Sequence, residues 1–169
     1  EAGLVFKTLP QIINLQAKRM AALLTAGIPK HWFYNNRDLL MPHSDSTPLI
    51  PMEAFKNAFL RNLHPIGRIT LEDSIDCYLF QKGELTIASI WNRKNQAKIF
   101  PIQMASDGRL YDIYGNSIAT LIAGKTSVSV ADGYVHYIEG IDADAYLQDP
   151  TFIPAFRSDA APQGKPENT

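Results

Sequence analysis

The sequence has 169 residues, a formal net charge of −1, 46% hydrophobic residues and 20% charged residues, which is typical of a globular protein of one ordinary domain or two small ones. The charges are scattered, without a basic stripe or polybasic patch, so the sequence favours neither nucleic acid nor a membrane as a partner. No apolar run approaches the ~20 residues that a membrane-spanning helix requires.

Residues that often carry metal or redox chemistry are sparse. Cys77 is the one cysteine and stands in the apolar run CYLF, which favours a small buried side chain over a reactive thiol. The histidines show no metal-ligand spacing with any carboxylate; they are His31, His43, His64 and His136. We therefore predict no metal ion and no cofactor.

The first predicted element is a helix over about residues 9–26. Thr8 and Gln11 have the spacing of a capping box, and Gly27 followed by Pro29 is typical of a helix end. One stripe of residues recurs at three- and four-residue spacing and is apolar except for Gln16. It consists of Leu9, Ile12, Ile13, Gln16, Met20, Leu23 and Leu24.

The helix is followed by a short aromatic strand, HWFYNN, at residues 31–36. Residues 37–51 contain three prolines among Ser, Asp and Thr residues and are predicted to be a loop. A second helix is predicted over about 52–63, where Phe55, Phe59 and Leu63 share one stripe.

From residue 68 to 141 the pattern changes to about seven short strands, with Gly, Asp or Asn at nearly every corner. This pattern predicts an antiparallel β-sandwich or barrel, and the chain as a whole is therefore expected to be α+β. From Asp142 onward the sequence is rich in proline and polar residues, which is typical of a tail or linker.

Two side chains in the β-rich half, Trp91 and Asp112, invite a functional interpretation. Trp91 could form a sugar-stacking platform, but core packing is favoured, although neither face of its strand is clearly the solvated one. Asp112 is expected to bond the backbone of its own turn, in which Gly115 supplies a positive φ. We interpret both as structural residues.

The run YVHYIEGI at 134–141 carries one carboxylate, Glu139. Strand alternation places Val135, Tyr137, Glu139 and Ile141 on one face. A lone carboxylate cannot carry out two-carboxylate acid–base chemistry, and a buried one needs a partner. Glu139 is therefore predicted to be structural.

The helix–strand–helix segment at the start cannot make a core of its own, because a strand buried on both faces needs neighbouring strands. Two arrangements remain open. The helices pack on the sandwich, or the segment is the end of a larger barrel.

The second arrangement agrees with a resemblance to a known family. LQAKRMAALLTAGIPKHWFYNNRD resembles the last turns of the (β/α)8 barrel in retaining glycoside hydrolases of the clan that uses two glutamates. WNRKNQAKI, LYDIYGN and TSVSVADGYVHYIEGI resemble strands of the β-sandwich that follows such barrels. The resemblance covers about residues 1–142 and departs from the family at Tyr134, where proline is usual.

The resemblance implies a division of the chain into the C-terminal elements of a (β/α)8 barrel at 1–64, an antiparallel β-sandwich accessory domain at 65–142 and a tail or linker at 143–169. It makes Glu1 a candidate nucleophile, with the acid/base carboxyl supplied from outside this chain. The alternative is that Glu1 has no such role.

Substrate-binding candidates follow from the same resemblance, because barrel active sites lie at the C-terminal ends of the strands. Trp32, Tyr34, Asn35 and Asn36 would lie at the end of the eighth strand and bind a sugar, with core packing of the aromatic residues as the alternative. Asp38 could touch substrate or cap its loop.

The expected function is therefore that of the C-terminal fragment of a glycoside hydrolase that works by double displacement, with the fragment alone inactive. The expected partners are a carbohydrate and the remainder of the barrel, and an extracellular or periplasmic location is favoured. A non-catalytic carbohydrate-binding module and a structural β-sandwich domain are the alternatives.

Overall fold

The computed structural model describes residues 9–28, 58–94, 96–130 and 133–156. Over these residues the chain is α+β, with one long helix and nine strands that pair only antiparallel. The elements in chain order are α1 (Leu9–Thr25), β1 (His64–Leu71), β2 (Ile75–Lys82), β3 (Leu85–Asn92), β4 (Lys98–Met104), β5 (Gly108–Tyr111), β6 (Ser117–Leu121), β7 (Gly124–Val130), β8 (His136–Glu139), the short 3-10 helix η1 (Asp144–Tyr146) and β9 (Ile153–Pro154).

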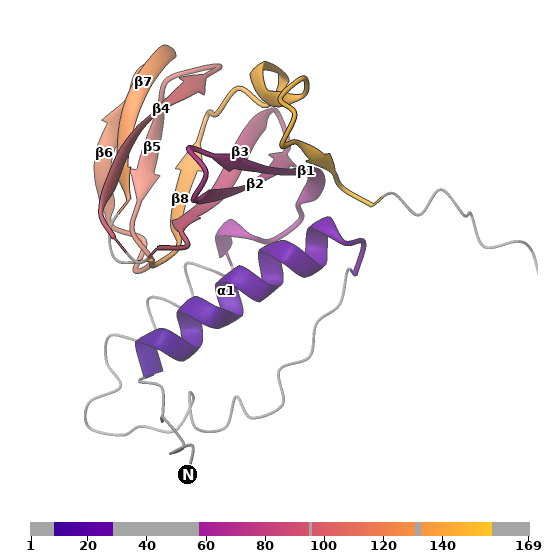
Figure 1. The fold of residues 1–169 in the computed structure, drawn as a ribbon, viewed down its shortest axis with the longest axis vertical. Helices are drawn as coiled ribbons and strands as arrows, with labels where there is room; N and C mark the ends of the chain where they lie inside the picture. The colour runs from indigo at the N-terminus through magenta and orange to yellow at the C-terminus, as the bar shows by residue number, and fades with distance from the viewer. Residues whose placement is uncertain (1–8, 29–57, 95, 131–132, 157–169) are drawn as a thin grey trace, which may run out of the picture.

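The strands form two sheets. The large sheet has the order β6-β5-β8-β3-β2-β1-β9, and the small sheet consists of β4 and β7 (Figure 1). One apolar core joins residues of both sheets, for example Leu79 and Ile90 from the large sheet with Phe100 and Val128 from the small one. The expected sandwich is therefore present, and its buried side chains include Cys77, whose thiol pKa is raised by burial.

The large sheet is buried on its second face as well. Alternate residues of β2 and β3 point away from the small sheet and form a second apolar cluster with α1, which includes Tyr78, Phe80 and Trp91. An antiparallel sheet commonly leaves one face to solvent. Here α1 lies across that face, beneath the sandwich in Figure 1. This explains why neither face of β3 reads as solvated in the sequence.

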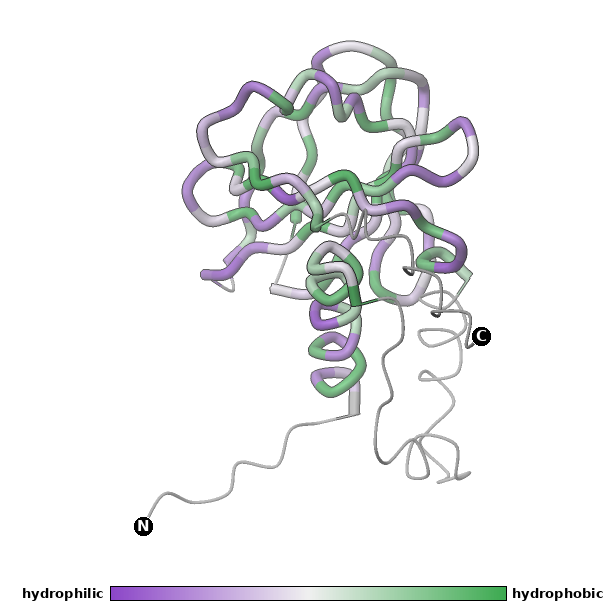
Figure 2. Tube along the Cα trace, turned by 90° about the vertical axis from the view of Figure 1, so that its right-hand side faces the viewer, coloured by the Kyte–Doolittle hydropathy of each residue, from purple (hydrophilic) through white to green (hydrophobic). Residues whose placement is uncertain are grey.

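Helix α1 confirms the predicted element almost to its ends. Ile13, Ala17 and Ala21 are fully buried, and Figure 2 shows hydrophobic and hydrophilic residues alternating along its turns. The helix closes with paired bonds, Ile28 N–H to Leu23 C=O at 2.9 Å and Gly27 N–H to Leu24 C=O at 3.1 Å. Gly27 has a φ of 77°, as this type of helix end requires.

The described part of the range 143–169 folds back on the rest of the molecule. Strand β9 pairs with β1 through Gly67 opposite Pro154, and the Ala155 N–H donates to the Ile66 carbonyl at 2.9 Å. The Phe156 N–H then donates to the Thr25 carbonyl in the last turn of α1 at 2.8 Å. The C-terminal segment thus ties β1 to α1.

Two details differ from the sequence-based expectations. Ile141 does not share a face with Tyr137: it belongs to the core between the sheets, because Gly140 adopts a φ of 84° and ends the strand alternation. The second predicted helix lies mostly outside the described residues. In its described part, helical residues 58 and 59 are followed by a turn over 60–62, so the helix ends earlier than predicted.

The expectations for Asp112 and Gly115 are confirmed. Asp112 Oδ1 accepts hydrogen bonds from the N–H groups of Tyr114 and Asn116, each at 2.9 Å, and Gly115 has a φ of 87°. No helix in the part of the chain that the structure describes is long and apolar enough to cross a membrane.

Close strand packing generates a first prediction. A Cβ added to Gly108 at the start of β5 would collide with the backbone carbonyl of Glu139 at the end of β8, whereas a Cβ at Gly83 would meet nothing within 4 Å. Gly108→Ala is expected to lower the free energy of unfolding by about 3 kcal/mol through overpacking. Gly83→Ala, at a φ of 61°, should cost only about 1 kcal/mol.

Urea denaturation of the two variants and the parent checks this difference. Equal losses in the two variants would contradict the tight contact between β5 and β8.

Candidate functional site

The residues that the sequence singled out for chemistry lie outside the described part of the chain. These are Glu1, Trp32, Tyr34, Asn35 and Asn36, and Asp38 lies there too. Their roles stay predictions. Among the described residues, polar and aromatic groups meet at the seam between α1 and the large sheet, at the Tyr111–Glu139 pair, and in a cleft beside β9.

The seam is built around Trp91. Its ring stacks on Tyr78 with centroids 5.0 Å apart and an interplanar angle of 16°, and the ammonium group of Lys18 on α1 lies 5.5 Å from the ring centroid. Trp91 is only 6% exposed, so the core interpretation is confirmed and a solvent-facing platform is ruled out for this ring. The cation–π contact helps fix the helix on the sheet.

Asp76 faces Trp91 across the β2–β3 ladder. Burial raises the pKa of its carboxyl above the ordinary value of 3.8, against the opposing effects of Arg93, Arg68, a hydrogen bond from Trp91 and Lys18. The Arg93 Nε lies 3.4 Å from the Asp76 Oδ1. Burial lowers the pKa of Lys18, and the charge of Asp76 partly offsets this. The seam therefore holds charged groups at the cost of desolvation.

Glu139 has the partner that a half-buried carboxylate needs. The Tyr111 hydroxyl on β5 donates to the Glu139 Oε2 at 2.8 Å. Burial, the hydrogen bond and the charge of Glu139 all raise the pKa of Tyr111, while Arg109 acts in the opposite direction. A carboxylate bonded to a tyrosine on the neighbouring strand fits a structural role.

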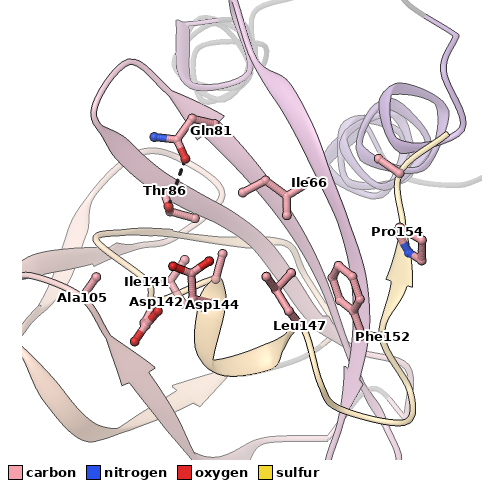
Figure 3. Close-up of a pocket in the computed structure, with 12 residues that line it drawn as sticks. Ile66, Gln81, Thr86, Ala105, Ile141, Asp142, Asp144, Leu147, Phe152 and Pro154 are labelled. Carbon is pink, nitrogen blue, oxygen red and sulfur yellow. Dashed lines mark hydrogen bonds between the residues drawn. The ribbon is translucent and has the colours of Figure 1, made fainter. Parts of the chain in front are cut away.

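The cleft has a volume of about 570 Å³, within the range of small-molecule sites. It opens where β1, β2 and β3 meet the chain that follows β8, and β9 forms its far side (Figure 3). It is lined by Ile66, Gln81, Thr86, Ala105, Ile141, Asp142, Ala143, Asp144, Leu147, Phe152, Pro154 and Ala155.

The polar wall of the cleft is held by local hydrogen bonds. The Gln81 Nε2 donates to the Gly83 carbonyl at 2.7 Å, and the Thr86 hydroxyl donates to the Gln81 Oε1 at 3.3 Å. The Asp142 Oδ1 accepts from the Ala145 N–H at 3.3 Å. In Figure 3 the Asp144 carboxylate lies between Thr86 and Leu147.

The apolar wall faces these groups from the other side. Ile66, Leu147 and Phe152 stand beside one another in Figure 3. Phe152 lies so close to β1 that a Cβ at Gly67 would be 2.6 Å from its ring, which is why a glycine is needed there. Leu147 is 41% exposed, so this wall is open to solvent.

The sequence interpretation missed this cleft. Seven of its twelve lining residues come after residue 141, where the composition suggested a tail. A usable signal was present in Phe152, Ile153 and Phe156, three large apolar residues in an otherwise polar stretch. Among the described residues, no group of three His, Cys, Asp or Glu side chains is arranged to hold a metal ion.

No protein-family model and no curated protein matches this sequence. The fold is similar to solved structures. One is a GH30 endoxylanase from Clostridium papyrosolvens C71, with a TM-score of 0.57 and 12% identity over 79% of this chain and 39% of that chain. Another is a GH27 β-L-arabinopyranosidase from Geobacillus stearothermophilus, with a TM-score of 0.52 and 9% identity over 78% of this chain and 31% of that chain.

This chain thus spans between 31% and 39% of the length of these two solved structures. At identities of this size the similarity establishes a shared fold and leaves activity open.

The raised pKa of Asp76 generates a second prediction. Because the folded-state pKa lies above the ordinary value of 3.8, the folded state binds more protons than the unfolded state between the two values. The stabilisation that protonated Asp76 provides is therefore fully present below a pH of about 3.8. It is lost as the pH rises through the folded-state pKa. Asp76→Asn removes this loss, so the variant should gain stability relative to the parent as the pH rises.

Urea denaturation of both proteins at a series of pH values between 3 and 7 measures this effect. Asp149→Asn is a control of opposite sign, because hydrogen bonds from Thr151 lower the pKa of Asp149. The stabilisation by Asp149 is present above 3.8 and is lost as the pH falls through its folded-state pKa. Parallel stability curves for Asp76→Asn and the parent would contradict the prediction.

Proposed function

We propose that this chain is the C-terminal part of a retaining glycoside hydrolase, with the last elements of a (β/α)8 barrel at 1–64 and an accessory β-sandwich at 65–142. The described part of the segment 143–169, expected to be a tail or linker, adds η1 and β9 to this sandwich. The observation that carries the proposal is the similarity of the fold to the two solved structures named above, of which this chain spans only 39% and 31%. The packing of α1 on the outer face of the large sheet is the helix-on-sandwich arrangement and is compatible with the proposal. A barrel helix that adjoins a sandwich domain would have this position. Both solved structures named above are glycosidases by name, which supports the same assignment.

The proposed chemistry is double displacement. Glu1 would attack the anomeric carbon, and a second carboxyl group from an earlier barrel strand, about 5 Å away, would protonate the leaving oxygen. Trp32 and Tyr34 would stack on the sugar, and Asn35 and Asn36 would bind its hydroxyl groups. Because the second carboxyl group would come from outside this chain, the chain by itself should not turn over substrate.

The role of the sandwich would be to support the end of the barrel. Ala17 and Ala21 are completely buried against the sheet, and Asn14 on α1 exchanges hydrogen bonds with the chain leading into β8: it donates to the Gly133 carbonyl at 3.2 Å and accepts from the Val135 N–H at 2.9 Å. A helix held in this way cannot shift relative to the sandwich without breaking buried contacts. In the proposed enzyme, the sandwich would therefore hold in place the barrel strand expected after this helix.

A structural β-sandwich domain is the second candidate. It is favoured by the burial of Tyr78, Phe80 and Trp91 beneath α1, because these rings are then unavailable as a planar platform for polysaccharide. This observation weighs against a carbohydrate-binding module of the surface-platform type.

Activity assays test the proposal. The 169-residue chain is expected to show no turnover of aryl glycosides, whereas a polypeptide that also includes the preceding barrel strands should hydrolyse them. In that longer polypeptide Glu1→Ala should lower kcat by at least ~10³-fold. Glu84→Gln, in an exposed turn of the sandwich, is the control and should retain the parent rate.

A chemical rescue distinguishes a nucleophile from a structural carboxylate. Azide added to the Glu1→Ala variant should restore turnover and give a glycosyl azide of inverted anomeric configuration, because the small anion takes the place of the missing carboxylate. Turnover by the 169-residue chain alone, or full activity of Glu1→Ala in the longer polypeptide, would refute the proposal.

A further inference from the structure

We propose that the cleft between η1, β9 and the β1–β3 edge is a binding site for a neutral saccharide. The site belongs to the sandwich and includes none of the residues assigned to the active site, so it goes beyond the proposed hydrolase function. It would hold a sugar chain on the accessory domain.

The charges of the cleft select the class of ligand. The lining that the structure describes contains two carboxylates, Asp142 and Asp144, and no lysine, arginine or histidine. A phosphate, sulfate or uronate would therefore meet only like charge and lose its hydration shell without a compensating cation. Hydroxyl groups are well suited to the same wall, because a carboxylate accepts hydrogen bonds from O–H donors.

The free acceptors are open to solvent. Asp144 is exposed at the start of η1. Asp142 is partly buried and uses its Oδ1 for the Ala145 N–H, which leaves the Oδ2 for a ligand. Gln81 and Thr86 complete the wall with an amide and a hydroxyl group, each of which can both donate and accept.

The opposite wall suits the other surface of a sugar. A pyranose ring presents C–H groups on its faces and hydroxyl groups around its rim. Phe152 and Leu147 offer an aromatic ring and a branched aliphatic side chain on the side of the cleft away from Gln81 and Thr86 (Figure 3). A ligand with hydroxyl groups and no apolar face, such as a small linear polyol, would use only half of this arrangement.

The cleft is held in shape before any ligand enters. The Gln103 N–H donates to the Tyr146 hydroxyl at 2.7 Å, which fixes η1 on β4. Thr151 is fixed to β1 in both directions: its hydroxyl donates to the Thr70 carbonyl at 3.1 Å and accepts from the Thr70 N–H at 3.3 Å. A preformed site loses less conformational entropy on binding than a site that must be ordered. The volume of about 570 Å³ has room for one or two sugar rings.

The test is a titration of the isotope-labelled 169-residue chain with neutral xylotriose, cellotriose and galactobiose, monitored by amide NMR shifts. At least one of these sugars is expected to shift the amides of the 141–155 segment and of Thr86 in a saturable manner, with a Kd on the order of 1 mM. A xylo-oligosaccharide with a glucuronic acid branch should bind more weakly than its neutral counterpart.

Matched variants locate the site. Asp144→Asn should weaken binding about tenfold, which is the loss expected for a hydrogen bond to a charged group. Glu72→Gln makes the same change at the opposite end of β1, where Glu72 has an exposed ion pair with Lys98, and should leave the Kd unchanged. Leu147→Ala should weaken binding, while Ile99→Ala, a residue 73% exposed on β4, should not.

Thermal unfolding of each variant shows that it folds like the parent. The proposal is overturned if none of the neutral sugars shifts the cleft amides at concentrations about tenfold above the expected Kd. It is also overturned if Asp144→Asn and Leu147→Ala, when folded, bind as well as the parent, or if the acidic sugar binds more tightly than the neutral one. These outcomes do not depend on turnover by the longer polypeptide, so the binding site and the hydrolase proposal can fail separately.

Discussion

The burial of aromatic side chains between α1 and the large sheet is the interaction on which the rest of the structure depends. Tyr78, Phe80 and Trp91 project from the sheet face opposite the sandwich core, and each such ring contributes roughly 1.5–3 kcal/mol when it is fully removed from water. The helix can cover them because Ala17 and Ala21 let its backbone approach closely. Without this helix the sheet would expose a large apolar face, which favours association.

The same packing separates the two proposed roles of the molecule in space. The N-terminal side of the fold, where α1 covers the sheet, is where the barrel would continue. The cleft lies where η1 and β9 pass the edge formed by β1, β2 and β3. A ligand in the cleft would therefore be held by a domain that does not itself take part in bond cleavage. Because β1 both contacts α1 and lines the cleft, it would hold the cleft in a fixed position relative to the helix.

Much of this fold follows from local sequence signals, and the remainder depends on contacts between distant residues. The strands between 68 and 141 are recognisable because turn residues separate them, and α1 has both a stripe and an end signal in Gly27. The double burial of β3 could not be read from its own alternation, since the covering helix lies far away in sequence. Gly140 changes the face of Ile141 through one positive φ, and β9 is too short to have a pattern. The cleft could not be predicted for the same reason. Its walls η1 and β9 are held in place by contacts with β4 and β1, which are distant in sequence. The assignment of residues to catalysis comes from the resemblance to a known family and has no basis in local sequence pattern.

The bond from the Phe156 N–H to the Thr25 carbonyl also has a consequence for the order of folding. It joins residues near opposite ends of the described chain, and contacts between such distant positions carry the largest loop-closure entropy. The β2–β3 hairpin, by contrast, pairs neighbours in sequence. β9 should therefore dock late, after the helix and sheet have met, and should be among the first segments to open in native-state hydrogen exchange. Since β9 forms one side of the cleft, the ability to bind a sugar would appear only in the last step of folding.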